Sequence, residues 1–283
     1  LEKVKDDNTL EEVDKWITEV DEDGNAVQKE LEMPENGIYK LTEVTAPDGF
    51  KKAEEIFFEI VDGKVTKYYE ATVDENGNIT KLDEIPKEEA DKIGGEEHLV
   101  MVDAPSKLTI DKLAMTSKEE LVGAELKLTL TKPAEEGKTL KDVTFGERKD
   151  VTVDGNTISW TSVKDAALEL TKLPDGTYVL EETGGTVKDA DGNLYQVTDS
   201  TLEFTIEDGV ITTSKVVNED KNGEYEVNKN DSVITISDAQ RQVITISKVE
   251  IVGDKTPGVP GAELTLEKVK DDNTLEEVDK WIT

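Results

Sequence analysis

The chain carries GIYKLTE at Gly37–Glu43 and GTYVLEE at Gly176–Glu182. In both stretches apolar residues alternate with polar ones, which is the pattern of a strand with one buried face. Tyrosine, leucine and glutamate fall on the same face each time, so an apolar stripe ends in an ionisable group. We therefore interpret the two strands as equivalent elements of two related domains.

The same series of short motifs surrounds each of these strands. A strand with a lysine comes first, followed by Gly-Ala-Glu-Leu, a tryptophan, the Gly-x-Tyr strand and a strand closing on Asp-Ala. One series consists of Asp111–Leu113, Gly123–Leu126, Trp160, Gly176–Glu182 and Val233–Ala239, and the other of Ser247–Val249, Gly261–Leu264, Trp16 or its equivalent Trp281, Gly37–Glu43 and His98–Ala104. The second series starts near the end of the chain, so its domain is split across the chain ends.

Turn dipeptides punctuate most of the chain at short intervals. Asp-Gly or Asn-Gly pairs, which tolerate the left-handed backbone of tight hairpins, begin at Asp48, Asp62, Asn76, Asp154, Asp175, Asp208 and Asn222. Short strands separated by such turns predict an antiparallel sandwich or barrel. The exception is Ile85–Ile93, where a proline and a polar composition predict a short exposed helix.

An exact duplication accounts for the split domain. Residues Leu1–Thr18 (LEKVKDDNTLEEVDKWIT) recur as Leu266–Thr283, a period of 265 residues (266 − 1). Such self-similarity indicates a window from a tandem array, natural or engineered. We therefore predict a sandwich domain lacking its first strand at 1–105 and a complete sandwich domain at 106–241. Residues 242–283 would be the first strands of the next copy of the 1–105 domain.

The composition excludes several classes of function. The 283 residues carry a formal net charge of −33, so the surface repels nucleic acid phosphates and anionic membranes. The chain has no cysteine, which excludes disulfides and cysteine-based metal sites. We also expect no membrane contact by this segment, since no apolar run approaches spanning length.

Each domain has three apolar stripes that end in a lysine, a glutamate and an aspartate. These residues are Lys112, Glu182 and Asp238 in the complete domain, and Lys248, Glu43 and Asp103 in the split domain. Such residues are rarely buried unless paired. One interpretation is that they reach solvent or form an ordinary salt bridge. The other is chemical: burial favours a neutral amine and a neutral carboxyl, which condense to an amide while a second carboxyl relays protons.

The stretch Tyr39–Phe50 (YKLTEVTAPDGF) resembles the signature of collagen-adhesin B-type domains, the prealbumin-like (SpaA-like) repeats of Gram-positive surface adhesins and pili. His98–Ala104 (HLVMVDA) is similar to the peptide tag split from a streptococcal fibronectin-binding protein domain, as used in the SpyTag/SpyCatcher pair. The resemblance implies an all-β fold of two tandem antiparallel Ig-like or prealbumin-like β-sandwich domains, one split across the chain ends. It also implies spontaneous Lys–Asp isopeptide bonds promoted by a glutamate.

By this resemblance, Lys112 is the nucleophile, Asp238 the electrophile and Glu182 the catalytic proton relay of the complete domain. The corresponding residues of the split domain are Lys248, Asp103 and Glu43. After Glu182 the complete domain departs from the family, with Thr-Gly-Gly where Ala-Pro-x-Gly is expected. We expect Lys248 to bond Asp103 of the next copy, within the parent array or by strand donation between molecules.

These observations predict covalently stapled stalk or spacer repeats of an extracellular cell-surface adhesin or pilus-like protein, anchored to the cell wall through other parts. The partners would be neighbouring copies of the repeat. The chain would form its bonds autocatalytically, without turnover and without a cofactor or metal, so we do not expect an enzyme. An adhesive module for a host extracellular-matrix protein is the alternative. A glycosidase with paired carboxylates is a third class, but 66 acidic residues make such pairs uninformative.

Two acidic loops deserve comparison with calcium sites. Asp21–Asn25 and Asp189–Asn193 place oxygen ligands at the first, third and fifth positions, but the sixth is Ala26 or Leu194 where a glycine is needed. Hairpin turns explain both stretches better. The single histidine, His98, is expected to be solvated, and both Trp16 and Trp160 are expected in the cores.

Overall fold

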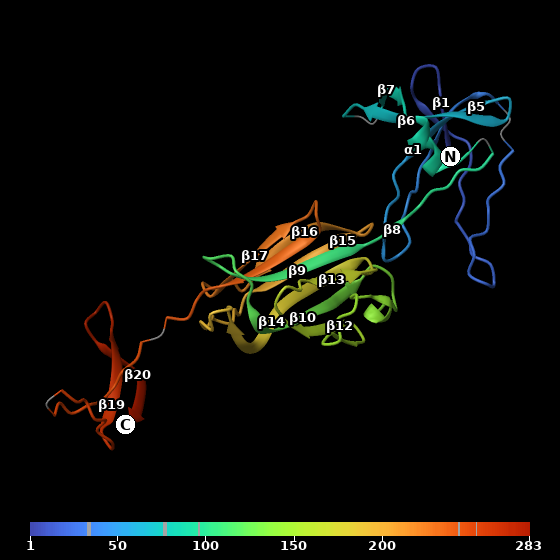
Figure 1. Ribbon diagram of the computed structural model, residues 1–283. Coiled ribbons are helices and arrows are strands. Elements are labelled where there is room, and N and C mark those ends of the chain that lie inside the picture. The colour runs from blue at the N-terminus through green and yellow to red at the C-terminus, as the bar shows by residue number, and fades with distance from the viewer. Residues whose placement is uncertain (33–34, 76–77, 96, 243, 253) are drawn as a thin grey trace. The chain divides into compact units, whose positions relative to one another are not determined.

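The computed structural model describes residues 1–32, 35–75, 78–95, 97–242, 244–252 and 254–283. The chain forms two compact units, Leu1–Gln240 and Arg241–Thr283. Strands dominate both units, so the all-β class predicted from the sequence is confirmed (Figure 1). Among the described residues, no helix is long and apolar enough to cross a membrane. The Asn76-Gly77 turn predicted above lies outside the described residues.

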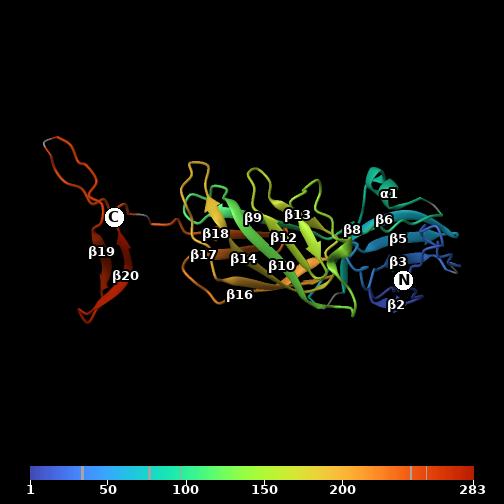
Figure 2. The same cartoon turned by 90° about the horizontal axis from the view of Figure 1, so that it is seen from below.

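Residues 107–238 form two facing sheets with one core between them (Figure 2). The larger sheet has the order β11-β12-β10-β14-β15-β16, formed by Thr152–Asp154, Thr157–Thr161, Val122–Pro133, Gly176–Lys188, Thr201–Glu207 and Val210–Val217. The smaller sheet has the order β13-β9-β18-β17, formed by Leu168–Thr171, Lys107–Ala114, Val233–Asp238 and Gly223–Asn228. A 3-10 turn, η1, covers Leu140–Asp142.

Alternation in the sequence decides which side chains fill this core. Along β9 every second residue is buried, so that Leu108 and Ile110 point inward and the intervening residues do not. The same pattern buries Leu126 and Leu128 of β10 and Ile234 of β18. Trp160 of β12 is also buried, as predicted from its place in the motif series.

The first and last strands of the sandwich, β9 and β18, pair directly with each other. These two strands run parallel, with Ile234 opposite Ile110 and Ile236 opposite Lys112. The other named strand pairs of the described residues are antiparallel. The exception arises because β9 and β18 are the first and last strands of the sandwich, and they traverse it in the same direction.

Residues 1–105 form one large sheet with the order β2-β1-β3-β5-β6-β7. Its strands are Leu10–Glu12, Glu2–Val4, Gly37–Leu41, Ile56–Val61, Lys64–Val73 and Ile79–Glu84, and β4 (Phe50–Lys51) pairs with β8 (Ala104–Pro105) separately. Helix α1 spans Lys87–Ile93 and buries no residue, which confirms the predicted exposed helix. The counterpart of the smaller sheet of residues 107–238 is not formed among the described residues of this region.

The two regions nevertheless share details that only related domains are expected to share. Tyr39 pairs and stacks with Phe58, and Tyr178 pairs and stacks with Phe204 in the same register. Each tyrosine hydroxyl donates a hydrogen bond to the backbone carbonyl four residues earlier, at Glu35 and Pro174 respectively. The equivalence read from Gly37–Glu43 and Gly176–Glu182 therefore extends to packing.

The stretch 98–103 is not the strand that its alternating pattern predicts. Leu99 makes an isolated bridge with Gly94, and regular pairing begins only at Ala104. In the complete sandwich, the equivalent β18 lies between β9 and β17. A strand equivalent to β9 is not formed beside 98–103 among the described residues, so the backbone there lacks the neighbour that would order it.

Among the described residues of Arg241–Thr283, the named strands form a hairpin of β19 (Glu263–Val269) with β20 (Leu275–Ile282). Isolated antiparallel bridges also join Val249 to Gly258 and Val252 to Lys255. Leu264 faces Trp281 in the hairpin, as Leu126 faces Trp160 in the complete sandwich. The two series of motifs are thus equivalent at this pair as well.

Three of the Asp-Gly pairs lie at the tight hairpins that we predicted, joining β5 to β6, β11 to β12 and β15 to β16. Asp175-Gly176 does not form a hairpin. Instead the Asp175 carboxylate accepts hydrogen bonds from the backbone N–H groups of Asp208 and Gly209, at 2.7 and 3.1 Å, and so holds the β15–β16 turn. Asn222-Gly223 is not a hairpin either, because Gly223 begins β17.

Candidate functional site

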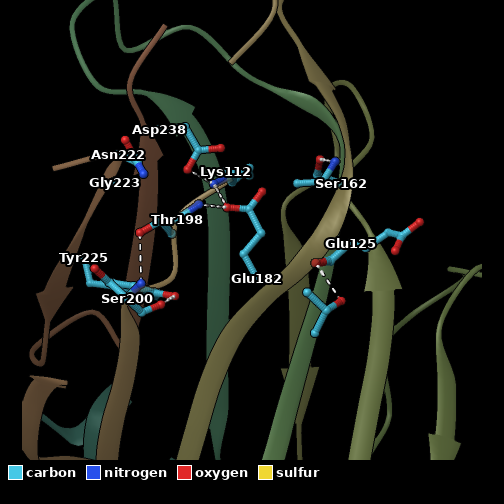
Figure 3. Close-up of polar contacts among 12 residues, drawn as sticks. Lys112, Glu125, Ser162, Glu182, Thr198, Ser200, Asn222, Gly223, Tyr225 and Asp238 are labelled. Carbon is cyan, nitrogen blue, oxygen red and sulfur yellow. Dashed lines mark hydrogen bonds and ion pairs between the residues drawn. The ribbon is translucent and has the colours of Figure 1, made fainter. Parts of the chain in front are cut away.

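Three strands bring one ionisable side chain each to the same end of the sandwich core (Figure 3). Lys112 comes from β9, Glu182 from β14 and Asp238 from β18. Each residue continues the apolar stripe of its strand, so the alternation that buries leucine and isoleucine also turns these groups inward. Since β9 and β18 belong to one sheet and β14 to the other, the group bridges both layers.

The three side chains are in direct contact. Lys112 Nζ donates hydrogen bonds to Glu182 Oε2 at 3.1 Å and to Asp238 Oδ1. The exposed fraction of the side chain is 3% for Lys112 and 0% for both acids. Water therefore does not separate the amine from the carboxyl groups, and the amine is in direct hydrogen-bond contact with both acids.

The two carboxylic acids differ in their remaining contacts. Glu182 Oε2 also accepts a hydrogen bond from the backbone N–H of Thr198 at 3.2 Å (Figure 3). Glu182 Oε1 and Asp238 Oδ2 are buried and have no hydrogen-bond partner among the described residues. Such an orphaned oxygen is unfavourable for a charged carboxylate, so the site favours a protonated acid.

The protonation of Asp238 follows from the same surroundings. Burial raises the pKa of Asp238 to about 7; the positive charge of Lys112 opposes this rise and the negative charge of Glu182 adds to it. An aspartic acid that keeps its proton near neutral pH retains an electrophilic carbonyl carbon, whereas the carboxylate does not. Burial also raises the pKa of the nearby Tyr225 hydroxyl far above its ordinary value, so that this group stays neutral.

A network outside the predicted set positions the glutamate. Thr198 is fully buried. Its hydroxyl donates a hydrogen bond to Asp220 Oδ1 at 2.9 Å and accepts one from the backbone N–H of Ser200 at 3.1 Å. Gly223 packs so closely that a Cβ there would lie 2.6 Å from the Thr198 Cβ. These residues could not be predicted from the sequence, because Thr198 acts through its backbone N–H and belongs to no motif.

The split set is only partly assembled. Glu43 is half-buried and accepts a hydrogen bond from the backbone N–H of Ala53 at 2.6 Å. Burial raises the pKa of Glu43, the Ala53 hydrogen bond opposes that rise, and the negative charge of Asp103 adds to it. Lys248 is exposed and belongs to the other unit, Arg241–Thr283.

The acidic loops form the turns that we expected. Asp21 Oδ1 accepts hydrogen bonds from the backbone N–H groups of Asp23 and Asn25, and Asp189 Oδ1 does the same with Asp191 and Asn193. Among the described residues, no cluster of three metal-ligating side chains is present. His98 is exposed, as predicted.

Comparison with known protein families gives a match to one part of the chain. Residues 1–76 match the model of the SpaA family, described as a prealbumin-like fold domain. This region therefore contains a prealbumin-like fold domain, as the resemblance of Tyr39–Phe50 predicted. Comparison with curated proteins found no match.

Solved structures similar to the chain include Gram-positive pilus adhesins and pilins. The C-terminal fragment of pilus adhesin SpaC from Lactobacillus rhamnosus GG is 17% identical, with 78% of this chain and 83% of that chain covered and a TM-score of 0.31. The pilus adhesin RrgA from Streptococcus pneumoniae is 15% identical, with 67% and 21% covered and a TM-score of 0.33. BcpA, the major pilin subunit of Bacillus cereus, is 16% identical, with 70% and 40% covered and a TM-score of 0.28. The chain spans most of the SpaC fragment but less than half of the other two proteins.

Proposed function

We propose that this chain is a structural spacer repeat of an extracellular surface protein, and that residues 106–240 staple themselves with an isopeptide bond between Lys112 and Asp238. The observation that carries the proposal is the fully buried contact of Lys112 Nζ with Asp238 and Glu182. An ordinary salt bridge needs neither a second acid nor a carboxyl group with an orphaned oxygen. A condensation uses the second acid to carry protons, and it needs the protonated carboxyl group that an orphaned oxygen favours.

The reaction requires one proton transfer and one condensation. Within the contact, the Lys112 amine gives up a proton and Asp238 holds one, which is favoured because burial destabilises both charged forms. Lys112 Nζ then attacks Asp238 Cγ, and Glu182 takes the proton that the nitrogen releases. Glu182 returns that proton to the departing hydroxyl, and one water leaves as the Nζ–Cγ amide forms. Glu182 ends in its starting state.

Contact in a dry core supplies most of the acceleration. Groups held in a reacting geometry behave as though at an effective concentration of about 10⁵ M or more. The amide product is neutral, so the unfavourable burial of charge disappears when the bond forms. Each site reacts once and its product stays part of the chain, which is why we propose autocatalysis without turnover.

A spacer repeat benefits directly from such a bond. It closes the chain between positions 126 residues apart and so limits how far the unfolded chain can open. Without cysteine, the chain has no disulfide to do this. Surface location fits the same proposal, because proteins outside the cell must withstand proteases without chaperones or replacement.

Intact mass measurement tests the proposal. The folded chain should be lighter than its sequence by one water, and a digest should yield a branched peptide joining Lys112 to Asp238. Lys112→Ala should restore the full mass. Lys118→Ala, at an exposed lysine six positions away in the turn that follows β9, should leave the deficit. A wild-type chain of full mass after prolonged incubation would refute the bond.

A further inference from the structure

A small cavity borders Lys112 in the complete sandwich. Lys112 lines it together with apolar side chains such as Leu126 and Trp160, and its volume is about 20 Å³. A cavity needs roughly 10 to 15 Å³ to hold one water molecule. This cavity therefore has room for one water beside an amine that the proposed condensation requires to be dry.

One wall of the cavity is formed by the segment 162–167, which we call the strap. It joins β12 to β13 and so crosses from the larger sheet to the smaller one. The ladder between β13 and β9 ends where Leu168 faces Ile110, two residues before Lys112. If the ladder continued, Ala166 would face Lys112. The strap leaves the sheet there instead, and both residues line the cavity that remains.

The strap is a thin barrier. Val163, Ala166 and Ala167 all line the cavity, yet Val163 is 40% exposed and Ala167 is exposed as well. Such residues border the cavity on one side and solvent on the other. Movement of the strap would therefore connect the cavity, and with it the Lys112 side chain, to bulk water.

Arg148 fixes both ends of the strap. Its Nη1 donates a hydrogen bond to the backbone carbonyl of Ala166 and its Nη2 donates one to that of Thr161, each at 2.9 Å. Its Nε donates to the Asp150 carboxylate at 2.7 Å, and the side chain is only 14% exposed. The guanidinium carries five N–H donors in a rigid plane, so this one side chain can hold two carbonyls and a carboxylate at once.

Glu120 holds the middle of the strap. Its Oε2 accepts a hydrogen bond from the backbone N–H of Asp165 at 2.7 Å. The backbone of Glu120 forms an isolated bridge with Leu113, the residue after Lys112. The strap is thus tied to the strand that carries the amine as well as to its own ends.

We propose that the strap keeps bulk water away from the Lys112 amine, and that Arg148 and Glu120 are the positioning residues that hold it closed. The inference rests on the proposed condensation, which starts from a neutral amine and a neutral acid. Water favours the ion pair instead. From the ordinary pKa values of lysine and aspartic acid, the neutral pair is about 10⁶-fold rarer than the ion pair in water. A closed strap therefore raises the fraction of molecules in which Lys112 and Asp238 can react.

Substitution of Arg148 in the full chain tests the inference. Arg148→Met removes the donors but keeps a long unbranched side chain, and it should slow the loss of water by about tenfold or more, as followed by intact mass after refolding. Arg148→Lys, which keeps one donor group but not the planar fork, should give an intermediate rate. Arg241→Met, at an exposed arginine outside the sandwich, should leave the rate unchanged.

Glu120→Ala provides a second test that does not depend on the folding of the Arg148 variants. Glu120 is exposed, so its truncation should leave the core intact while releasing Asp165 of the strap. The loss of water should be slower than in the wild type. Glu119→Ala, at the exposed neighbouring glutamate, should react at the wild-type rate.

Trp160 reports directly on water in the cavity, which it lines while being only 5% exposed. With Trp16→Phe and Trp281→Phe in the background, Arg148→Met should shift the Trp160 emission to longer wavelength and increase its quenching by acrylamide. The same change should occur when Lys112→Met is added, although that chain forms no bond.

These readouts separate the inference from the proposed function. Unchanged Trp160 emission and wild-type rates in Arg148→Met and Glu120→Ala, with the Lys112–Asp238 bond still forming, would overturn the role of the strap alone. A wild-type chain of full mass would refute the condensation, and the Trp160 emission would still decide whether the strap excludes water.

Discussion

Glu182→Gln provides the sharpest test of how the buried site stabilises the complete sandwich. The change keeps the size of the side chain and leaves Lys112 and Asp238 in place, but removes the carboxylate that carries the proton. We expect the variant to fold, to keep the full mass of its sequence, and to lack the branched peptide.

The loss of stability can be worked out from the loop that the bond closes. Lys112 and Asp238 are 126 positions apart, and closing a loop of that length removes unfolded-state entropy equivalent to about 5 kcal/mol at 25 °C. For a domain of this size, each kcal/mol shifts the unfolding midpoint by about 3 to 5 °C. Thermal unfolding of Glu182→Gln should therefore occur about 15 to 25 °C below that of the wild type.

A double variant distinguishes the stability that comes from closing the loop from the stability that comes from the buried charges. Lys112→Met with Asp238→Asn cannot form the bond and has no ionised pair, so its midpoint should fall by a similar amount. If only Glu182→Gln were destabilised, the loss would come from disrupted charges. If the wild type lacked a water and yet both variants unfolded within about 1 kcal/mol of it, the entropic argument would be wrong.

Three further predictions concern the surroundings of the site. In Lys112→Met, Asp238 should keep its proton to at least about pH 7 in the folded state but lose it near pH 4 in the unfolded state. The free energy of unfolding should therefore fall as the pH rises from about 4 to 7. Urea unfolding at several pH values should show this decrease, and adding Asp238→Asn should abolish it. Gly223→Ala should push Thr198 away from Glu182 and slow the loss of water, as followed by mass after refolding. Gly95→Ala, where a Cβ meets no atom, should leave the rate unchanged. Equal rates in the two variants would contradict the role of Thr198 in positioning Glu182. Tyr178→Phe should orphan the buried Pro174 carbonyl and reduce the free energy of unfolding by about 1 to 3 kcal/mol; no change in urea unfolding would show that the hydrogen bond contributes nothing net.

Much of the site could be predicted because period-two alternation assigns residues to faces. The stripes ending in Lys112, Glu182 and Asp238 were recognisable from sequence alone, and the three groups meet in the core. The equivalence of Tyr39 and Tyr178 was also recognisable from sequence, and the structure extends it to their hydroxyl contacts. Local patterns were sufficient here, because the residues near a position in the sequence decide whether it lies in a strand and which face of the strand it occupies.

Other features depend on residues far apart in the chain, and the sequence did not reveal them. The parallel pairing of β9 with β18 depends on the path of the whole sandwich. The pattern of 98–103 predicted a strand, but a strand needs a neighbour, and that neighbour is absent from the described residues of 1–105. Thr198 contributes a backbone N–H, which any residue but proline possesses.

The parallel pairing of β9 with β18 has a mechanical consequence. A pull on the two ends of the sandwich enters at the start of β9 and leaves at the end of β18, so it slides the strands past each other and loads their backbone hydrogen bonds together. Once Lys112 and Asp238 are joined, tension passes along β9 to Lys112, crosses the amide to Asp238 and leaves the domain at the end of β18. The intervening chain, with nearly all of the core, bears no load. Such a repeat should transmit force as a rigid link and never act as a spring.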